Sequence, residues 1–359
     1  MLLTENAVAG NCGGFFVPRS RSSCEMFALA CPQIRETGMT VQWGVLGASR
    51  FARDNMAPAI HAAKGANLAA LATSSVEKAA SFQAFAPDIK VHLDYDALLA
   101  DPSIDAIYIP LPNHLHVPWT IKALQAGKHV LCEKPIALNA KAFDDLIAAR
   151  DASGLIAAEA FMIVHHSQFI RARALVQSGA IGELVHIDGT FSYNNAGDVT
   201  NIRHDPTKGG GALPDIGVYP IGAARFVSGL EPAAVTLSNL RYEHGVDVFA
   251  QVAADFGATS FSAIVSMRMM NYQQITFHGT KGILRLTCPF NANKADVAEL
   301  ILDRKDMPRS TERWPAENHY VGQIENFCAS VRGEAAFPCP LEWSKGTQVM
   351  LDMIYAAAQ

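Results

Sequence analysis

The feature that most constrains the fold is a regular alternation of short apolar strands and helical stretches in the first half of this 359-residue chain. Strands are expected at 41–46, 68–73, 106–110 and 129–132, and helices at about 51–64, 76–85 and 117–126. Gly127 follows the last of these helices, where a helix C-terminus commonly takes a glycine. This order predicts an α/β fold with a doubly wound parallel sheet and right-handed crossovers.

The turn after the first strand is a degenerate form of the dinucleotide fingerprint Gly-x-Gly-x-x-Gly/Ala. Gly47 suits a tight turn and Ala52 permits close helix packing, whereas Ser49 replaces the second glycine and could donate its hydroxyl to a pyrophosphate. An ordinary strand–helix turn explains the motif about equally well when the motif is taken alone. Its place after the first strand favours cofactor binding, with Gly47, Ser49, Arg50 and Phe51 as candidate contacts.

The end of the second strand bears on the choice between NAD and NADP. An NAD-selective site usually has an acidic residue here for the ribose 2′-hydroxyl, and the sequence has Thr73-Ser74-Ser75 instead, with Lys78 one turn into the next helix. Hydroxyl groups and a lysine suit a 2′-phosphate better. Ser74, Ser75 and Lys78 therefore favour NADP, with NAD possible, although Lys78 fits a solvated helix face equally well.

The strand that begins at His129 closes with Cys132-Glu133-Lys134-Pro135. Doubly wound sheets bind ligands at the carboxyl ends of their strands, so Lys134 could polarise a substrate hydroxyl and stabilise the alkoxide that forms before hydride transfer. Pro135 restricts the backbone of Lys134 to an extended conformation. A lone lysine is usually a surface residue, but this position favours a functional one.

A glycine-rich cluster runs from Gly209 to Tyr219, and a helix is expected to begin near Asp215 and to run past Ala224. Asp215 and Tyr219 are four residues apart and would share one helix face. Tyr219 could act as a general acid or base if a nearby charge such as Lys134 lowers its pKa. The spacing alone slightly favours a plainer interpretation, with Asp215 as a helix cap and Tyr219 as a core aromatic.

The runs 107–116 (IYIPLPNHLH), 126–135 (AGKHVLCEKP), 159–162 (EAFM) and 209–219 (GGGALPDIGVY) together resemble the glucose-fructose oxidoreductase / inositol dehydrogenase family. The resemblance extends from Met39 to about Ala356. It implies a Rossmann domain, then an open and mostly antiparallel sheet, with Lys134 as the catalytic lysine. Many members have a histidine where this chain has Tyr219. With a tyrosine at this position, the chain resembles the branch that contains D-xylose dehydrogenase and dimeric dihydrodiol dehydrogenase. The resemblance implies that Tyr219 is the proton donor or acceptor.

The resemblance also assigns expected roles to the remaining candidate residues. Cofactor contacts are expected from Pro112, Asn113, His116 and Glu133, with Asn113 and His116 on the nicotinamide side. Substrate contacts are expected from Tyr193, Arg203, Asp215 and Tyr219, with Asp215 orienting its neighbours. Arg203 could equally hold a loop by a salt bridge.

The second half changes to a period of two, which is typical of half-buried antiparallel strands. Such runs occupy 185–193, 246–256, 260–267 and 275–286, and amphipathic helices are expected at 320–331 and 343–356. We expect a disordered or spurious extension over 1–38, a dinucleotide-binding domain over 39–160 and an α+β substrate and dimerisation domain over 161–359. A sheet with helices on one face predicts a homodimer or a higher oligomer through the other face.

Composition limits the partners and the compartment. Half of the chain is apolar and the net charge is −5, with no basic stripe, so no nucleic-acid partner is expected. No apolar run reaches the roughly 20 residues of a spanning helix, so no membrane segment is expected. Seven dispersed cysteines predict reduced thiols and a cytoplasmic location. The histidine pairs lack the spacing of a two-histidine site, so no metal is expected.

These features favour hydride transfer between NADP, or NAD, and a small polyhydroxylated substrate such as a sugar or a cyclic diol. Two alternatives remain. One is a non-catalytic dinucleotide-binding regulator, against which the retained Lys134, Asp215 and Tyr219 argue, and the other is a sugar oxidoreductase whose NADP does not dissociate.

Overall fold

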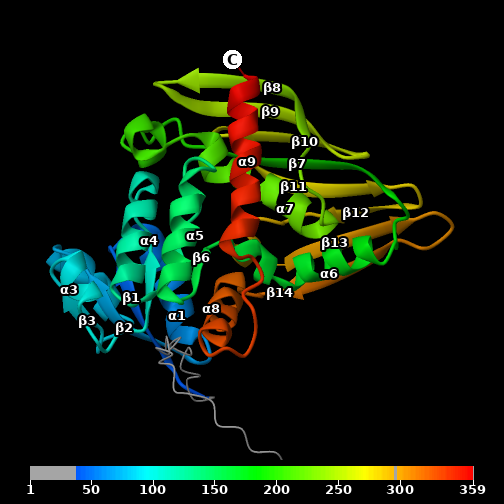
Figure 1. Ribbon diagram of the computed structural model, residues 1–359. Coiled ribbons are helices and arrows are strands. Elements are labelled where there is room, and N and C mark those ends of the chain that lie inside the picture. Colours follow the sequence, from blue (N-terminus) through cyan, green and yellow to red (C-terminus); the bar gives the residue numbers. More distant parts are fainter. Residues whose placement is uncertain (1–37, 295–296, 359) are drawn as a thin grey trace, which may run out of the picture. The chain divides into compact units, whose positions relative to one another are not determined.

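The computed structural model describes residues 38–294 and 297–358, which form one compact unit. The extension expected over 1–38 lies outside these residues apart from Gly38. Figure 1 shows two sheets, one in the blue to cyan part of the chain and one in the green to orange part.

The first sheet has six parallel strands in the order β3-β2-β1-β4-β5-β6, which confirms the doubly wound sheet. The strand order reverses direction between β1 and β4, the position at which such sheets bind ligands. Its strands are β1 (Val41–Leu46), β2 (Ala66–Ala72), β3 (Lys90–His92), β4 (Ala106–Ile109), β5 (His129–Cys132) and β6 (Ala157–Glu159).

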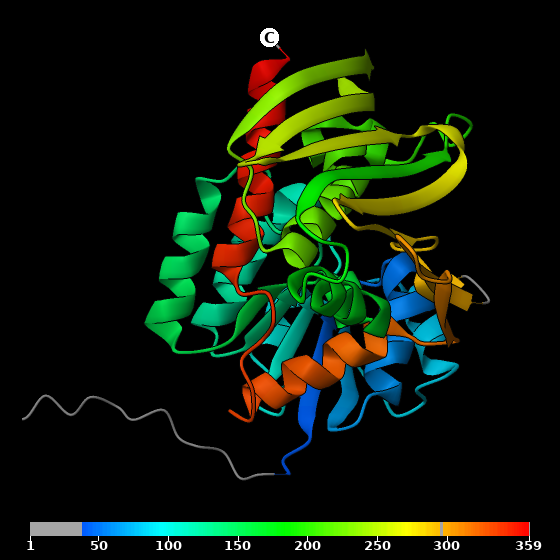
Figure 2. The ribbon, with the colours of Figure 1, turned by 90° about the vertical axis from the view of Figure 1, so that its right-hand side faces the viewer.

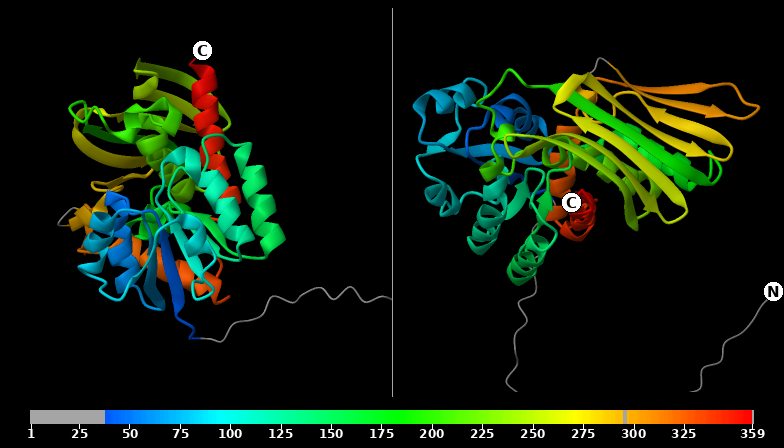
Figure 3. Two further views of the ribbon diagram at one scale, coloured as in Figure 1. Left: turned by 90° about the vertical axis from the view of Figure 1, so that its left-hand side faces the viewer. Right: turned by 90° about the horizontal axis from the view of Figure 1, so that it is seen from above.

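Helices connect these strands and cover both faces of the sheet (Figure 3). They are η1 (Ala52–Met56), α1 (Ala57–Ala62), α2 (Val76–Gln83), α3 (Tyr95–Leu99), η2 (Asn113–Leu115), α4 (His116–Gln125) and α5 (Ala142–Ser153). Gly127 follows α4 at φ +78°, as expected for a glycine after a helix end. The sequence analysis missed β3, α3, α5 and β6. Three of these have only three to five residues and are too short to show a period, whereas α5 has twelve residues and was not recognised.

The second sheet has eight strands in the order β14-β13-β12-β11-β7-β10-β9-β8. All neighbours are antiparallel except β7 and β10, which confirms the mostly antiparallel sheet. Its strands are β7 (Leu184–Asn194), β8 (Ala234–Glu243), β9 (Val246–Phe256), β10 (Thr259–Ser266), β11 (Arg268–Gly279), β12 (Gly282–Leu286), β13 (Val297–Arg304) and β14 (Ser310–Pro315).

The single strand expected over 275–286 is wrong. The structure divides this run into β11 and β12, which pair with each other through a hairpin turn at Thr280 and Lys281. Gly279 lies against the Ile181 carbonyl so closely that a side chain would overlap it. Apolar residues alternate on both sides of this turn, so the sequence pattern does not show where one strand ends and the next begins. Strands β8, β13 and β14 were also missed, and in the edge strands β8 and β14 every residue is at least partly exposed.

Helices cover one face of the second sheet (Figures 1 and 3), where α7 (Val218–Ser228) packs on β7 and α9 (Leu341–Ala357) packs on β8. Figure 2 shows α8 (His319–Val331) beside the blue first domain, where it packs against α1. The remaining helices are η3 (Met162–His165), α6 (Ser167–Gln177), η4 (Ile202–His204), η5 (Pro206–Lys208), η6 (Leu213–Gly217) and η7 (Ala292–Lys294).

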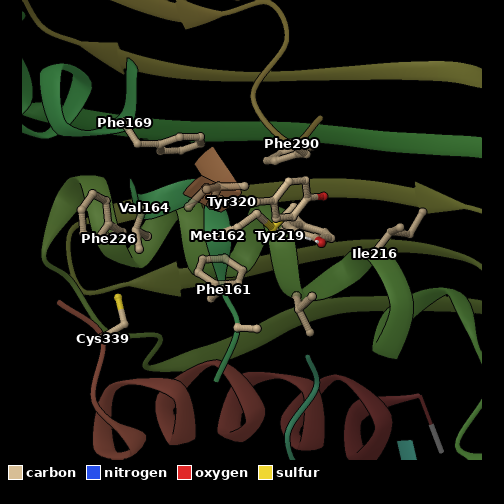
Figure 4. Close-up of a cluster of buried hydrophobic side chains, with 14 of the residues drawn as sticks. Phe161, Met162, Val164, Phe169, Ile216, Tyr219, Phe226, Phe290, Tyr320 and Cys339 are labelled. Atoms are coloured by element: carbon tan, nitrogen blue, oxygen red, sulfur yellow. Dashed lines mark hydrogen bonds between the residues drawn. The ribbon is translucent and has the colours of Figure 1, made fainter. Parts of the chain in front are cut away.

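The two sheets share one apolar core, which runs from Trp43 of β1 through Phe161 and Tyr219 to Phe277 of β11. The expected domain boundary at residue 160 lies just after β6, inside this core. Figure 4 shows the central part of the core, where Tyr219 and Tyr320 lie among Phe161, Met162 and Phe290. The packing joins the two sheets along their contact and so fixes the cavity between them.

Candidate active site

A cavity of about 910 Å³ lies between the carboxyl ends of the first sheet and one end of the second, and is called the central cavity below. Many of the candidate residues line it: Ser49, Arg50, Phe51, Asn113, His116, Glu133, Lys134, Tyr193, Arg203, Asp215 and Tyr219. Five candidates do not line it: Gly47, Ser74, Ser75, Lys78 and Pro112. Segments far apart in the sequence therefore meet where the strand order of the first sheet reverses, between β1 and β4.

The glycine turn has the geometry of a tight strand–helix connection. Gly47 has φ +109°, and an added Cβ would lie 2.9 Å from Leu111 Cδ2, so only glycine fits without strain. The Ser49 hydroxyl accepts a hydrogen bond of 3.0 Å from the Ala52 N–H and thereby caps the helix. Its hydroxyl proton stays available to a ligand. The Arg50 side chain is 89% exposed beside Asp54.

The hydroxyl-rich end of β2 has a structural role of its own. Ser75 is the N-cap of α2 and accepts a hydrogen bond from the Lys78 N–H, while Thr73 Oγ1 accepts one from the Ser75 N–H. The side chains of Ser74 and Lys78 are exposed beyond the central cavity. Ser74 and Lys78 therefore lie in solvent just after the end of β2.

Lys134 and Asp215 meet in the central cavity although 81 residues separate them. The Lys134 ammonium donates hydrogen bonds to the Asp215 carbonyl at 2.5 Å and to Asp215 Oδ1 at 3.2 Å. Each side chain is only 12% exposed. The Lys134–Pro135 peptide bond is cis. The nitrogen of Lys134 also lies 5.0 Å from the centre of the Tyr219 ring.

Asp215 binds two further side chains through its second oxygen. Tyr193 donates its hydroxyl to Oδ2 at 2.6 Å, and Arg203 Nε lies 2.8 Å from the same oxygen as an ion pair. Burial opposes ionisation of Asp215, but the charges of Arg203 and Lys134 outweigh it and hold its pKa well below the ordinary value. Burial and the Asp215 charge raise the pKa of Tyr193. Asp215 is thus an anion that orders three donors.

Tyr219 is both a core aromatic and a residue that lines the central cavity, so the structure contains features of both interpretations of the sequence. Its ring stacks on Phe161 at 5.7 Å and packs against Phe191 and Phe290. Its hydroxyl has a weak partner, Met162 Sδ at 3.6 Å. Lys134 does reach the ring, but burial, with the nearby Tyr320 and carboxylates, raises the pKa of Tyr219 well above its ordinary value. The sequence analysis made acid–base catalysis by Tyr219 conditional on a lowered pKa, and burial acts in the opposite direction.

Helix α7 is preceded directly by η6, so the helical segment begins at Leu213, two residues before the expected Asp215. Asp215 lies inside its first turn and does not cap it.

Glu133 faces the central cavity and accepts a hydrogen bond of 2.7 Å from the Tyr108 hydroxyl. Burial raises the pKa of Glu133 from 4.5 to about 7. His116 is fully buried, and its two ring nitrogens lie 2.7 Å from the carbonyls of Pro135 and Leu111. Its ring therefore braces the segment that carries Lys134. Burial lowers the pKa of His116 to about 4, while the two carbonyls favour the protonated ring, because a neutral imidazole can donate to only one of them.

Asn113 joins the two halves of the site, because its amide donates a hydrogen bond of 2.9 Å to the Gly209 carbonyl of the glycine cluster. Pro112 precedes it as the N-cap of η2.

Several residues that the sequence analysis missed line the rest of the central cavity. They include Asn195, Asn201, Lys208, Asn271, Tyr272, Gln273, Asn291, Lys294 and Tyr320. Amide groups dominate this set, and amides bind hydroxyl groups as donors and acceptors alike. No local motif marks these residues. Tyr320 follows the helix cap Asn318, which was the one available signal near it.

Among residues 38–294 and 297–358, no three histidine, cysteine, aspartate or glutamate residues are grouped so that they could hold a metal ion. None of the helices in this described part of the chain has both the length and the apolar character to span a bilayer.

In a comparison with known protein families, two family models match this chain. Residues 41–161 match the oxidoreductase family with an NAD-binding Rossmann fold, and residues 169–285 match the GFO/IDH/MocA C-terminal domain. An uncharacterized oxidoreductase of Rhizobium meliloti is 37% identical over 89% of this chain and 97% of its own length.

Two further relatives have named activities or ligands. A D-xylose 1-dehydrogenase (NADP(+)) of Haloferax volcanii is 30% identical over 89% of this chain and 98% of its own length. The solved structure of KijD10, a 3-ketoreductase from Actinomadura kijaniata in complex with NADP and TDP-benzene, matches with a TM-score of 0.81 and 28% identity. That match covers 88% of this chain and 97% of the other.

Proposed function

This chain belongs to the glucose-fructose oxidoreductase / inositol dehydrogenase family of NAD(P)-dependent oxidoreductases, and we propose that it transfers hydride between NADP and a hydroxyl or carbonyl carbon of a sugar or cyclic diol. The observation that carries the proposal is the contact of Lys134 with Asp215, beside Tyr219, at the carboxyl end of β5.

The central cavity suits a dinucleotide at one end and a small substrate at the other. Its volume of about 910 Å³ is at the upper end of the range for ligand sites. At the cofactor end, Gly47 allows the tight turn, and Ser49, Arg50 and Phe51 line the cavity where the helix begins, so helix amides can face an anion. Asn113, His116 and Glu133 line the adjoining part.

The protein residues handle the proton and the charge on the reacting oxygen. The cofactor, when bound, supplies or accepts the hydride. Lys134 is placed to donate a hydrogen bond to the substrate oxygen and to stabilise negative charge on it. Tyr219, whose raised pKa keeps it protonated, can donate its proton to that oxygen when a carbonyl is reduced. Oxidation of the alcohol is the reverse of this step, so it requires the tyrosinate form of Tyr219 as the proton acceptor. Asp215 holds Lys134, Tyr193 and Arg203 in register.

A polyhydroxylated substrate fits the other end of the cavity. Tyr193 and Arg203 line it with the amides of Asn195, Asn271 and Gln273. Lys208 and Lys294 line it too, which would suit a substrate that carries a phosphate group. A substrate screen therefore includes free aldoses, cyclic diols and sugar nucleotides.

The test of the chemistry is Lys134→Ala, with Lys141→Ala as the matched control because Lys141 is exposed at the start of α5, outside the cavity. On a substrate found in the screen, we expect Lys134→Ala to lower kcat by about 100-fold to 10,000-fold. Lys141→Ala should leave kcat unchanged. A folded Lys134→Ala protein that keeps near-normal turnover would refute the mechanism.

The preference for NADP rests on Ser74, Ser75 and Lys78 at the exposed end of β2. Fluorescence titration with NADPH and NADH in parallel tests it, and Ser74→Asp should shift the preference toward NADH because the carboxylate repels a 2′-phosphate. Acid release of bound nucleotide beforehand detects a cofactor that does not dissociate. Tighter binding of NADH by the unmodified protein would overturn the preference.

Self-association through the uncovered face of the second sheet stays a proposal. That face carries polar side chains, among them the ion pair of His278 with Asp188 at 2.8 Å and the hydrogen bond of His186 with Ser260. Hydrophobic cover alone therefore does not require a partner. We expect a dimer by sedimentation equilibrium and a shift toward monomer in Ile264→Glu. A monomeric unmodified protein at micromolar concentration would contradict this.

The four described free cysteines support a reducing, cytoplasmic location.

A further inference from the structure

Asp247 lies at a break in the pairing of β8 with β9. Tyr242 is opposite Asp247, but Arg241 is opposite Phe249, so Val248 has no partner of its own on β8. This is a β-bulge, a device that redirects side chains near functional sites. If side chains alternated regularly along β9, Asp247 would lie on the polar face of the sheet. The residue is nevertheless only 2% exposed. The bulge explains why a carboxylate is buried here.

The Asp247 carboxylate bonds to two elements that are distant in the sequence. Oδ2 accepts a hydrogen bond of 2.7 Å from the Leu213 N–H, and Oδ1 accepts one of 2.7 Å from the Tyr355 hydroxyl. Leu213 is the first residue of the helical segment η6–α7, and Tyr355 belongs to α9. The first N–H groups of a helix have no partner within it and are stabilised by an anion. Asp247 therefore supplies an acceptor that the helix lacks.

The glycine cluster is shaped around the same carboxylate. Gly211 has φ +132°, and a Cβ at this position would overlap Asp247 Oδ1. The glycine thus lets the chain pass beside the carboxylate just before the helix starts. Asp215, which binds Lys134, follows Leu213 by two residues on the first turn.

We propose that Asp247, held by Tyr355, is a positioning residue that anchors the first turn of the helix carrying Asp215 and Tyr219. Asp247 does not line the central cavity, so it acts on the reaction only through that helix. The catalytic part of this inference rests on the function proposed above, whereas the anchoring itself can be measured without turnover.

Two variants and a matched control test the proposal. Asp247→Asn removes the negative charge from both hydrogen bonds, and its amide NH₂ fits only if the Tyr355 hydroxyl turns to accept it. Tyr355→Phe removes one hydrogen bond while keeping the ring. The control is Ser238→Ala, because the Ser238 hydroxyl donates a 2.7 Å hydrogen bond to the carbonyl of Ile354, the neighbour of Tyr355. The control thus loosens α9 on β8 without touching the anchored helix.

The first readout is amide hydrogen exchange over residues 211–219. For Tyr355→Phe we expect exchange to be about fivefold faster in this segment, the change in opening equilibrium that a lost hydrogen bond of ordinary strength produces. A larger increase is expected for Asp247→Asn and none for Ser238→Ala. Unchanged exchange in both variants would overturn the proposal, even if no substrate were found for the enzyme.

The second readout separates positioning from general destabilisation. In an active enzyme, Tyr355→Phe and Asp247→Asn should lower kcat, with the NADPH dissociation constant kept within about twofold, because the cofactor end of the cavity is untouched. Faster exchange without a fall in kcat would show that the anchor has no catalytic role. If Asp247→Asn does not fold, Tyr355→Phe alone decides between these outcomes.

Discussion

Replacing Asp215 with asparagine tests the centre of the proposed site most directly. The carboxylate holds Lys134 at 3.2 Å, Arg203 at 2.8 Å and the Tyr193 hydroxyl at 2.6 Å. Asparagine keeps the size of the side chain but removes the charge and replaces one acceptor oxygen with a donor. Asp215→Asn therefore leaves two cations facing each other without a counter-ion.

The magnitude follows from burial. Removing one partner of a fully buried ion pair costs about 3–5 kcal/mol, whereas an exposed pair contributes about 0–1 kcal/mol. Lys134 and Asp215 are each 12% exposed, but Arg203 is 41% exposed and stays partly solvated. We therefore expect a loss of about 2–3 kcal/mol in the free energy of unfolding. In a chain of this size this loss lowers Tm by about 3–5 °C.

The pH dependence of this loss has a definite sign. The pKa of Asp215 in the folded protein lies below its ordinary value of 3.8. A depressed carboxyl pKa contributes stability that is present above the unfolded pKa and is lost as the pH falls through the folded pKa. The difference between the two proteins should thus be the same at pH 7.5 and pH 5, and should narrow only below pH 3.8.

The assay combines urea unfolding at these pH values with turnover on a substrate from the screen. Turnover should fall by about 100-fold, because Lys134 loses the group that aims it. Asp303→Asn is the control: it removes the same charge from an ion pair with Arg309 at 2.6 Å, and neither residue lines the central cavity. If Asp215→Asn changes stability and turnover no more than Asp303→Asn, the assignment of Asp215 is refuted.

Two further predictions concern neighbouring residues. Glu133→Gln keeps the acceptor for Tyr108 but removes a carboxyl whose pKa is raised from 4.5 to about 7, so the native protein should lose stability relative to the variant as the pH rises from 4.5 through 7. Urea midpoints of both proteins at pH 5 and 8 measure this, and a constant difference would contradict it. Gly211→Ala should cost about 1–3 kcal/mol through its positive φ, plus the overlap with Asp247, whereas Gly197→Ala, in open space, should be neutral. Thermal unfolding compares the two, and equal Tm values would show that the contact is unimportant.

Much of the local structure follows from the sequence because its causes are local. Strand β5 and strand β9 begin and end as expected, since apolar periodicity and flanking turn residues act within a few positions. The motif around Lys134 and the glycine cluster were also recognisable, and both line the central cavity. Expectations failed where the signal was short or continuous, as in β3 and in the run that the hairpin of β11 and β12 divides. They also failed for two longer helices, α5 and α6.

The chemistry of the site needed the tertiary structure. Sequence spacing put Asp215 and Tyr219 on one helix, but it could not show that Tyr193, Arg203 and Lys134 converge on one carboxylate. It suggested that Lys134 lowers the pKa of Tyr219, whereas the packed rings around the tyrosine raise it. A pKa depends on burial and on charges brought in by other elements, and neither is encoded at neighbouring positions.

The sequence by itself determined the order of the elements, the dinucleotide turn and the two motifs that place this chain in its family, because each depends on residues close together in the chain. Only the tertiary structure decided which of those residues meet. The contact between Asp247 and Tyr355 joins positions 108 residues apart, and it forms at a bulge where Asp247 is buried against the alternation of β9. Such contacts arise from how whole sheets and helices pack, so no local pattern announces them.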